Sequence, residues 1–159
     1  MGTLLYKSPV GGIFISAQDG KITQLYFDGG RTTPADLKAA EPKTAEDKAV
    51  LQKLAKELDM YFAGELKEFT VPVNPVGTPF RKVVWQALQA IPYGETISYK
   101  ELAERINNPK AIRAVGGANH NNPISIIIPC HRVIGANGKL VGYGGGLGAK
   151  EYLLELEQK

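Results

Sequence analysis

Ten residues near the middle of the chain limit the possible folds more than any other segment. Residues 70–79, Thr-Val-Pro-Val-Asn-Pro-Val-Gly-Thr-Pro, contain three prolines and one glycine. Neither a helix nor a central strand accommodates that density, because proline lacks the backbone N–H that both structures need. The segment therefore predicts a connection between two folded parts. We expect an N-terminal domain over residues 1–72, a linker over 73–79 and a C-terminal domain over 80–159.

The N-terminal part begins with a pattern typical of strands. Apolar runs at residues 4–6, 13–15 and 22–27 are separated by the glycine pair Gly11-Gly12 and by Asp19-Gly20, a hairpin-turn dipeptide. This spacing predicts a small antiparallel meander.

Helices are predicted after the meander and after the linker. One begins at Thr33-Pro34, and another begins at Thr44, whose first turn is acidic. Apolar residues then recur at helical spacing as far as Phe62, which indicates an amphipathic helix packed on the sheet, with Met60 in the core. A further helix after the linker carries Trp85, which we interpret as a core anchor. The fold class is therefore α+β.

Two short helices with a tight turn follow. Ser98 and Glu101 form a capping-box pattern that opens a helix ending near Ile106. Residues 107–109, Asn-Asn-Pro, break it, and a second helix runs from Lys110 to about Asn119. This arrangement predicts a helix-turn-helix. The second helix is built of small residues around one long cation, Arg113, so its backbone could approach another surface closely.

Cys130 is the only cysteine, and it lies in the run Ile-Pro-Cys-His-Arg-Val-Ile after an apolar strand predicted at residues 124–128. A lone thiol can form neither an internal disulfide nor a multi-thiolate metal site. It is either a small buried hydrophobe or a nucleophile. The neighbouring imidazole of His131 favours the nucleophile, because a nearby base or cation promotes the thiolate.

Charge and composition restrict the partners and the compartment. The net charge is +3, and from Pro79 onward ten Lys/Arg face six Asp/Glu, so the basic excess lies in the half with Cys130. This suits a polyanion, although scattered surface charge would give the same count. A single cysteine argues against a disulfide-stapled secreted protein, and neither a signal peptide nor a membrane-length apolar run is present. We therefore expect a cytoplasmic protein.

The last part of the chain combines a glycine-rich loop with a helix. Five glycines within residues 142–148 lack the spacing of a phosphate-binding loop, and they suit a backbone that approaches a flat ligand beside Tyr143. A final helix over residues 149–157 brings Glu157 close to the end of the chain.

Three motifs together resemble the O6-alkylguanine-DNA alkyltransferase family. They are Arg-Ala-Val-Gly-Gly-Ala-Asn-His-Asn-Asn-Pro at 113–123, Ile-Pro-Cys-His-Arg-Val-Ile at 128–134 and Gly-Tyr-Gly-Gly-Gly-Leu at 142–147. The resemblance covers about residues 78–157. It implies a small antiparallel sheet with helices in a ribonuclease H-like layout, followed by a mainly helical domain with a winged-type helix-turn-helix.

The same resemblance implies a direct-reversal DNA repair protein. Cys130 would irreversibly accept an alkyl group from O6 of guanine, or from O4 of thymine, in double-stranded DNA after base flipping, once per molecule. His131 would act as base through a water, and Glu157 would orient it. Tyr99 would donate to the leaving purine and help to rotate the nucleotide, and Asn122 would tie the helix-turn-helix to the active-site strand.

Further residues are implied by the resemblance to contact DNA and the extruded base. Arg113 would intercalate in place of the flipped base, while small side chains would let the second helix enter a minor groove only about 6 Å wide. The DNA-contacting set is Arg113, Ala111, Ala114, Gly117 and Tyr99, and the guanine pocket is formed by Val133, Tyr143, Gly144 and Gly145. With one cysteine and only His120 and His131, the zinc site of some relatives is not expected. We expect no cofactor, no membrane association and a monomer.

Two other functions remain open on the residues alone. A helix-turn-helix regulator or damage sensor would bind DNA without using Cys130. A cysteine hydrolase could use Cys130, His131 and Glu157 with repeated turnover, although adjacent residues rarely face each other directly.

Overall fold

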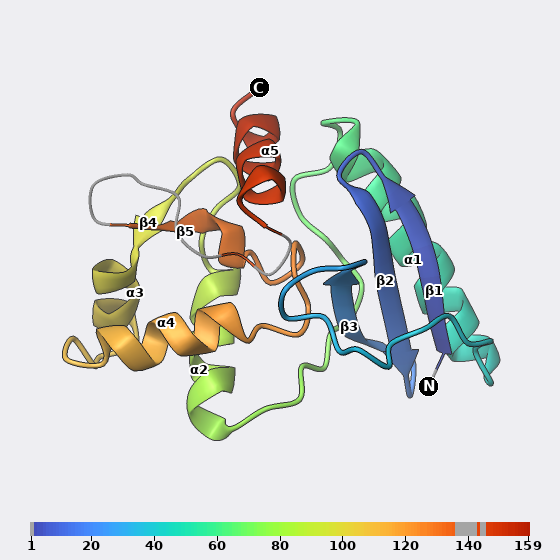
Figure 1. Ribbon diagram of the computed structural model, residues 1–159, viewed down its shortest axis with the longest axis horizontal. Helices are drawn as coiled ribbons and strands as arrows, with labels where there is room; N and C mark the ends of the chain where they lie inside the picture. The colour runs from blue at the N-terminus through green and yellow to red at the C-terminus, as the bar shows by residue number, and fades with distance from the viewer. Residues whose placement is uncertain (1, 136–142, 144–145) are drawn as a thin grey trace.

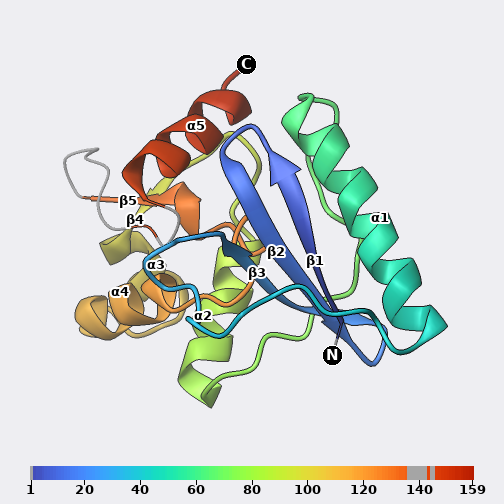
Figure 2. The ribbon, with the colours of Figure 1, turned by 45° about the vertical axis from the view of Figure 1, so that its right-hand side comes forward.

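The computed structural model describes residues 2–135, 143 and 146–159. The N-terminal half forms a three-stranded antiparallel sheet with the order β1 (Gly2–Ser8), β2 (Gly11–Gln18) and β3 (Lys21–Phe27). Helix α1 (Ala45–Phe62) packs along this sheet, as Figure 2 shows. The predicted meander is confirmed. Asp19 and Gly20 turn between β2 and β3 with φ of 53° and 74°, which glycine and aspartate tolerate best.

The C-terminal half is mainly helical and lies on the other side of the molecule (Figure 1). It contains α2 (Pro79–Gln89), α3 (Tyr99–Arg105), α4 (Ile112–His120) and α5 (Leu147–Glu157). A short 3-10 turn, η1 (Cys130–Arg132), leads into β5 (Val133–Ile134), which pairs in parallel with β4 (Ile97–Ser98). The predicted α+β class is confirmed. Every helix among the described residues is too short or too polar to cross a membrane.

One core runs through both halves. Leu51, Leu54 and Leu58 of α1 are fully buried against the sheet, as the helical spacing predicted. Trp85 of α2 is also buried, and its indole N–H donates to the carbonyl of Ala118 at 2.8 Å. This bond fixes α2 against α4, so Trp85 is the predicted anchor.

Two segments join the halves along β3. The backbone of residues 72–74 runs beside Ile22, with hydrogen bonds of 2.8 and 2.9 Å, so this part of the Pro-rich segment adds a short parallel bridge to the sheet. Leu25 forms a second bridge, to Ile124. The Leu25 N–H donates to the carbonyl of Pro123 at 2.8 Å, and the Leu25 carbonyl accepts from the N–H of Ser125 at 3.1 Å. The sheet therefore touches the segment that leads to Cys130.

Two predicted elements are wrong. No helix begins at Thr33-Pro34: the Thr33 hydroxyl donates to the carbonyl of Phe27 at 2.5 Å, and Ala40 instead pairs with Thr3. The apolar run at residues 124–128 is buried except at Ile127, which is partly exposed, and it is not a strand. Ile126 has φ of +71°, which breaks the extended conformation, and only Ile124 keeps a bridge to the sheet.

Three smaller predictions need correction. The first turn of the meander is at Pro9-Val10 and not at the predicted Gly11-Gly12, because Gly11, with φ of 100°, is already the first residue of β2. Met60 is 42% exposed, so it lies outside the core. Ser98 caps α3 by accepting from Glu101 N–H at 3.1 Å, but the Glu101 carboxylate pairs with Arg105, so only half of the capping box forms.

Candidate active site

Cys130 is the first residue of the η1 turn and is buried. Its N–H donates to the carbonyl of Ile128 at 2.8 Å, and its own carbonyl accepts from the Asn119 side chain at 3.4 Å. Burial raises the pKa of the thiol, whereas Asn122, the charge of Lys150 and Ser125 oppose that rise. Because the net pKa shift is upward, the thiol is protonated at neutral pH and needs a base before it can attack.

The η1 turn sends three consecutive side chains in different directions. Successive residues of a 3-10 helix are about 120° apart, so His131 and Arg132 diverge from Cys130 and reach α5. His131 Nε2 lies 2.6 Å from Oε2 of Glu157. An ionised carboxylate can only accept, so Nε2 carries the hydrogen and Nδ1 presents its lone pair. Nδ1 is buried and bonds to none of the residues that the structure describes.

The protonation state of His131 suits a base. Burial lowers the pKa of its imidazole, and the hydrogen bond and charge of Glu157 raise it only in part. The net effect is a pKa below the ordinary value of 6.5, so the ring is neutral at pH 7. A neutral imidazole with a free lone pair can accept a proton, and the protonated thiol of the adjacent residue has one to give.

Glu157 collects several donors on its buried carboxylate. Arg132 Nε donates to Oε1 at 2.8 Å, Arg132 Nη2 donates to Oε2 at 3.1 Å, and the Tyr61 hydroxyl donates to Oε2 at 2.6 Å. Burial alone would raise the pKa of Glu157, but these hydrogen bonds and that of His131 lower it to about 2. The carboxylate is therefore ionised throughout the neutral range.

Arg132, Tyr61 and Lys150 were not predicted as site residues. Arg132 has a signal in the sequence: a cation inside an apolar motif needs a buried carboxylate partner. Tyr61 reads only as a core aromatic of α1. Lys150 of α5 is fully buried, its Nζ donates to the carbonyl of Val133 at 2.6 Å, and burial lowers its pKa to about 8. Nothing in the spacing of α5 marks this lysine.

Asn122 holds the loop that precedes the cysteine. Its side-chain oxygen accepts from Ile124 N–H at 2.9 Å, and its side-chain nitrogen donates to the carbonyl of Ile128 at 2.8 Å. The loop therefore closes around one buried amide, with Ile126 in its left-handed conformation between the two bonds. Both of these hydrogen bonds stay within residues 122–128, so the predicted role of Asn122 as a tie to the helix-turn-helix stays a prediction.

Two tyrosines lie close to the thiol. Tyr99, at the start of α3, is half-buried; burial raises its pKa, and a charge on Cys130 would raise it further. Tyr143 is buried, and its ring is edge-on to that of His131 at 6.5 Å and to that of Phe27 at 5.7 Å. Of the predicted pocket, Val133 and Tyr143 are thus near Cys130, while Gly144 and Gly145 lie outside the described residues.

Four of the five predicted DNA-contacting residues lie on α4 or directly before it, whereas Tyr99 lies at the start of α3. Arg113, Ala114 and Gly117 are exposed, and Ala111 is the residue before the first turn. A methyl group added at Gly117 would meet nothing within 4 Å, so the fold itself does not require glycine there. Glycine in a helix costs roughly 1 kcal/mol relative to alanine. The described residues therefore give no packing reason for glycine at position 117.

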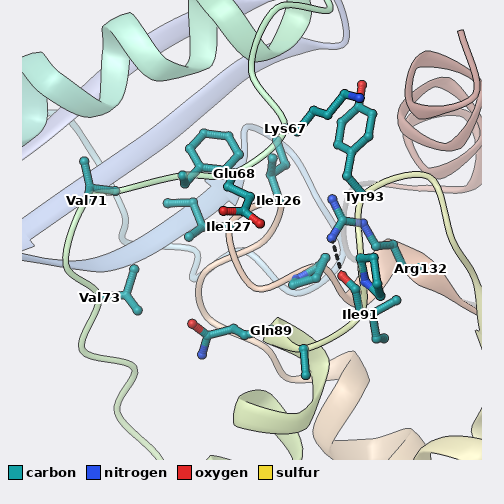
Figure 3. Close-up of a pocket in the computed structure, with 14 residues that line it drawn as sticks. Lys67, Glu68, Val71, Val73, Gln89, Ile91, Tyr93, Ile126, Ile127 and Arg132 are labelled. Carbon is teal, nitrogen blue, oxygen red and sulfur yellow. Dashed lines mark hydrogen bonds between the residues drawn. The ribbon is translucent and has the colours of Figure 1, made fainter.

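A cavity of about 410 Å³ lies beside this network (Figure 3). Its lining includes Pro129, Arg132 and Tyr93, whose ring lies 5.7 Å from the Arg132 guanidinium carbon. Cys130, Tyr99 and Tyr143 are not among the described lining residues, so the cavity borders the network without opening on the thiol. Within the described parts of the chain, no group of three His, Cys, Asp or Glu side chains could hold a metal ion.

Comparisons with known proteins cover nearly the whole chain. The family model described as "6-O-methylguanine DNA methyltransferase, ribonuclease-like domain" matches residues 3–75, and that described as "6-O-methylguanine DNA methyltransferase, DNA binding domain" matches residues 79–159. A methylated-DNA--protein-cysteine methyltransferase from Methanosarcina acetivorans is 49% identical over 154 residues, 96% of each chain. One from Mycobacterium leprae is 49% identical, over 95% of this chain and 88% of its own.

A solved structure shares the same fold. The crystal structure of Mycobacterium tuberculosis OGT in complex with DNA superposes with a TM-score of 0.86 at 45% identity. The match covers 97% of this chain and 91% of that one.

Proposed function

Because this chain belongs to the 6-O-methylguanine DNA methyltransferase family, we propose that it repairs DNA by moving an alkyl group from O6 of guanine to Sγ of Cys130. The protein is then a methylated-DNA--protein-cysteine S-methyltransferase that acts once, since a thioether offers no group that water readily displaces. Transfer from O4 of thymine would follow the same chemistry. The observation that carries the proposal is the buried thiol of Cys130 beside the His131–Glu157 pair.

The proposed reaction divides the proton and the alkyl group between different residues. His131 Nδ1 takes the thiol proton through a water, and Glu157 stabilises the imidazolium that forms. Sγ then forms a bond to the alkyl carbon as the bond from that carbon to O6 breaks, and the electron pair stays with the purine. Tyr99 gives its hydroxyl proton to the purine as negative charge develops there, and the proton held by His131 returns to the Tyr99 oxygen through water, so guanine, Tyr99 and His131 all end neutral. Burial raises the Tyr99 pKa, which keeps that hydroxyl protonated until it is needed.

Asn122 and the pocket residues would position these groups. Asn122 keeps the loop before Cys130 closed, while Val133 and Tyr143 would form walls of the guanine pocket together with Gly144 and Gly145. Lys150 would fix the Val133 carbonyl through its 2.6 Å hydrogen bond.

Double-stranded DNA is the proposed partner, with α4 in the minor groove. Its exposed Arg113 would fill the space left by the extruded base, and Ala111, Ala114 and Gly117 would let the helix approach the groove. Phosphate contacts would dominate the affinity, so binding should weaken strongly as salt is raised.

Methyl transfer to Cys130 can be measured directly. Mixing the protein with an equal amount of duplex that contains one O6-methylguanine is expected to add one methyl group, mapped by mass spectrometry to the Cys130 peptide. Cys130→Ala should acquire none and should still bind the duplex. If Cys130 stays unmodified while the duplex is bound, the function is better explained as that of a DNA-binding regulator or sensor. Repeated turnover on an ester would favour a cysteine hydrolase.

Gly117→Ala separates the stability of α4 from its contact with DNA. The added methyl group meets nothing within 4 Å, so it is expected to stabilise the fold by about 0.5–1 kcal/mol. The same methyl group would hold the helix away from the groove and weaken DNA binding by about tenfold, or roughly 1.4 kcal/mol. Urea unfolding and fluorescence-anisotropy titrations measure the two effects.

Gly148→Ala is the matched control, because Gly148 is an exposed helical glycine of α5 whose added methyl group also meets nothing within 4 Å. It should alter stability alone. Unchanged DNA affinity in Gly117→Ala would rule out close approach at that position.

We further propose that the protein acts as a monomer in the cytoplasm, where reducing conditions keep a lone thiol free. Recovery from the cytoplasmic fraction as a species of 17.2 kDa on sedimentation is the check, and a dimer or a membrane-bound form would contradict it.

A further inference from the structure

Tyr61 brings the N-terminal half into the proposed catalytic network. It lies on the last turn of α1, 96 residues before Glu157, and its side chain is fully buried. Its hydroxyl donates at 2.6 Å to Oε2 of Glu157, the oxygen that also accepts from His131 Nε2 at 2.6 Å. Tyr61 thus brings a side chain of the N-terminal half into direct contact with the carboxylate that pairs with His131 and Arg132.

The ring of Tyr61 is held rigidly. Phe62 and Tyr93 stand edge-on to it, with ring centroids at 5.3 and 6.3 Å, and Phe69 packs at 5.4 Å. Burial and the adjacent Glu157 charge raise the pKa of Tyr61, so its hydroxyl stays a neutral donor at every pH where the protein works. A buried tyrosine needs some acceptor, and a backbone carbonyl would serve equally well for folding alone. The acceptor here is the oxygen that faces the proposed base.

We propose that Tyr61 is a positioning residue of the alkyl transfer, which fixes Oε2 of Glu157 and shares its negative charge with His131. This rests on the function proposed above. Each donor to Oε2 withdraws charge from the oxygen that stabilises the imidazolium. The N-terminal half thereby adjusts how readily His131 keeps the proton that it takes from Cys130, and the active site is incomplete without that half.

The charged and titratable groups around His131 fix the sign of the effect. They come from α5 (Glu157 and Lys150), from η1 (Cys130 and Arg132), from α1 (Tyr61), from the loop before β4 (Tyr93) and from the loop before α5 (Tyr143). Tyr61→Phe changes only one of them. With one donor fewer, Oε2 carries more negative charge and holds the imidazolium more tightly. The pKa of His131 should rise, and the loss of transfer on acidification should begin at a higher pH.

The first measurement is the pH dependence of the single-turnover transfer rate. In Tyr61→Phe, the pH of half-maximal rate is expected to move up by about half to one unit, with unchanged affinity for undamaged duplex. Tyr26→Phe removes the same oxygen from a half-buried tyrosine of β3 and should leave the profile in place. A Tyr61→Phe profile that superposes on that of the unmodified protein would overturn the proposal, even if its stability falls.

A second measurement does not depend on methyl transfer. The chain has two histidines, His131 and the exposed His120, so imidazole ¹⁵N NMR titrates the base beside an internal control. Tyr61→Phe should raise the pKa of His131, whereas the ¹⁵N signals of His120 should be the same in both proteins. If the protein transfers no methyl group while this shift appears, the function is wrong and the coupling stands. If transfer occurs and His131 does not shift, Tyr61 is only structural.

Discussion

Glu157→Gln is expected to slow methyl transfer by about two to four orders of magnitude and to destabilise the fold by roughly 3–5 kcal/mol. The amide keeps the shape of the side chain but removes its charge. In the unmodified protein the Arg132 guanidinium donates to both carboxylate oxygens, at 2.8 and 3.1 Å. In the variant this buried cation would face a neutral amide. His131 would lose the anion that stabilises its protonated form. Single-turnover rates and urea unfolding measure the two losses.

The pH dependence of stability gives Glu157→Gln a distinct signature. The pKa of Glu157 is lowered from 4.5 to about 2 in the folded protein, so the carboxylate contributes stability that is fully present above pH 4.5. That contribution, roughly 3 kcal/mol, is lost as the pH falls from 4.5 towards 2. Glu157→Gln should lack this part of the acid dependence.

Glu155→Gln is the control, since Glu155 is exposed on the same helix. Its rate and its acid dependence should match those of the unmodified protein. Transfer at an undiminished rate by folded Glu157→Gln would exclude any role of the carboxylate in catalysis.

The sequence predicts best those elements whose residues act on near neighbours. The strands of the meander, the Asp19-Gly20 turn and the helix that Thr44 opens all follow from local spacing and capping. The same reasoning failed at Thr33, because its hydroxyl bonds to the end of β3 and not to a first helical turn. Local signals were correct where no distant partner competed for them.

The residues around Glu157 show why part of the site escaped prediction. Tyr61 and Lys150 read as an ordinary core aromatic and an ordinary helix lysine, and their roles depend on contacts with residues far along the chain or on another element. Cys130 and His131 stood out because the lone thiol precedes an imidazole, whereas the role of Glu157 was implied only by the family resemblance. A hydrogen-bond network that joins α1, η1 and α5 produces no repeating residue pattern from which it could be predicted.

The loop at residues 124–128 is a further case, and it leads to the second large effect. Five consecutive apolar or small residues predict a buried strand, but burial alone does not fix the backbone. Asn122 supplies the hydrogen bonds that a neighbouring strand would otherwise make, at both ends of the loop. The conformation is therefore determined by one amide that precedes the apolar run.

Asn122→Ala is expected to slow methyl transfer by about 100-fold and to cost roughly 2–4 kcal/mol of stability. Ile124 N–H would lose its buried acceptor, and the Ile128 carbonyl would keep only the hydrogen bond from Cys130 N–H. Ile126, at φ of +71°, is held in a conformation that β-branched residues avoid, so the loop should relax once it is released. Cys130 follows this loop directly, and a displacement of about 1 Å is enough for such a loss of rate.

Asn121→Ala is the matched control for this prediction. Asn121 is the adjacent residue and is exposed, and the one side-chain hydrogen bond that it makes to a described residue is local, to the carbonyl of Gly117 at 2.8 Å. Its transfer rate should stay within a factor of about two, because no group near the thiol depends on it. If Asn122→Ala loses stability but keeps the full rate, the loop conformation matters for folding and the thiol reaches its attacking position without it. A loss of rate that exceeds the fraction of unfolded protein would instead assign the amide to the geometry of transfer.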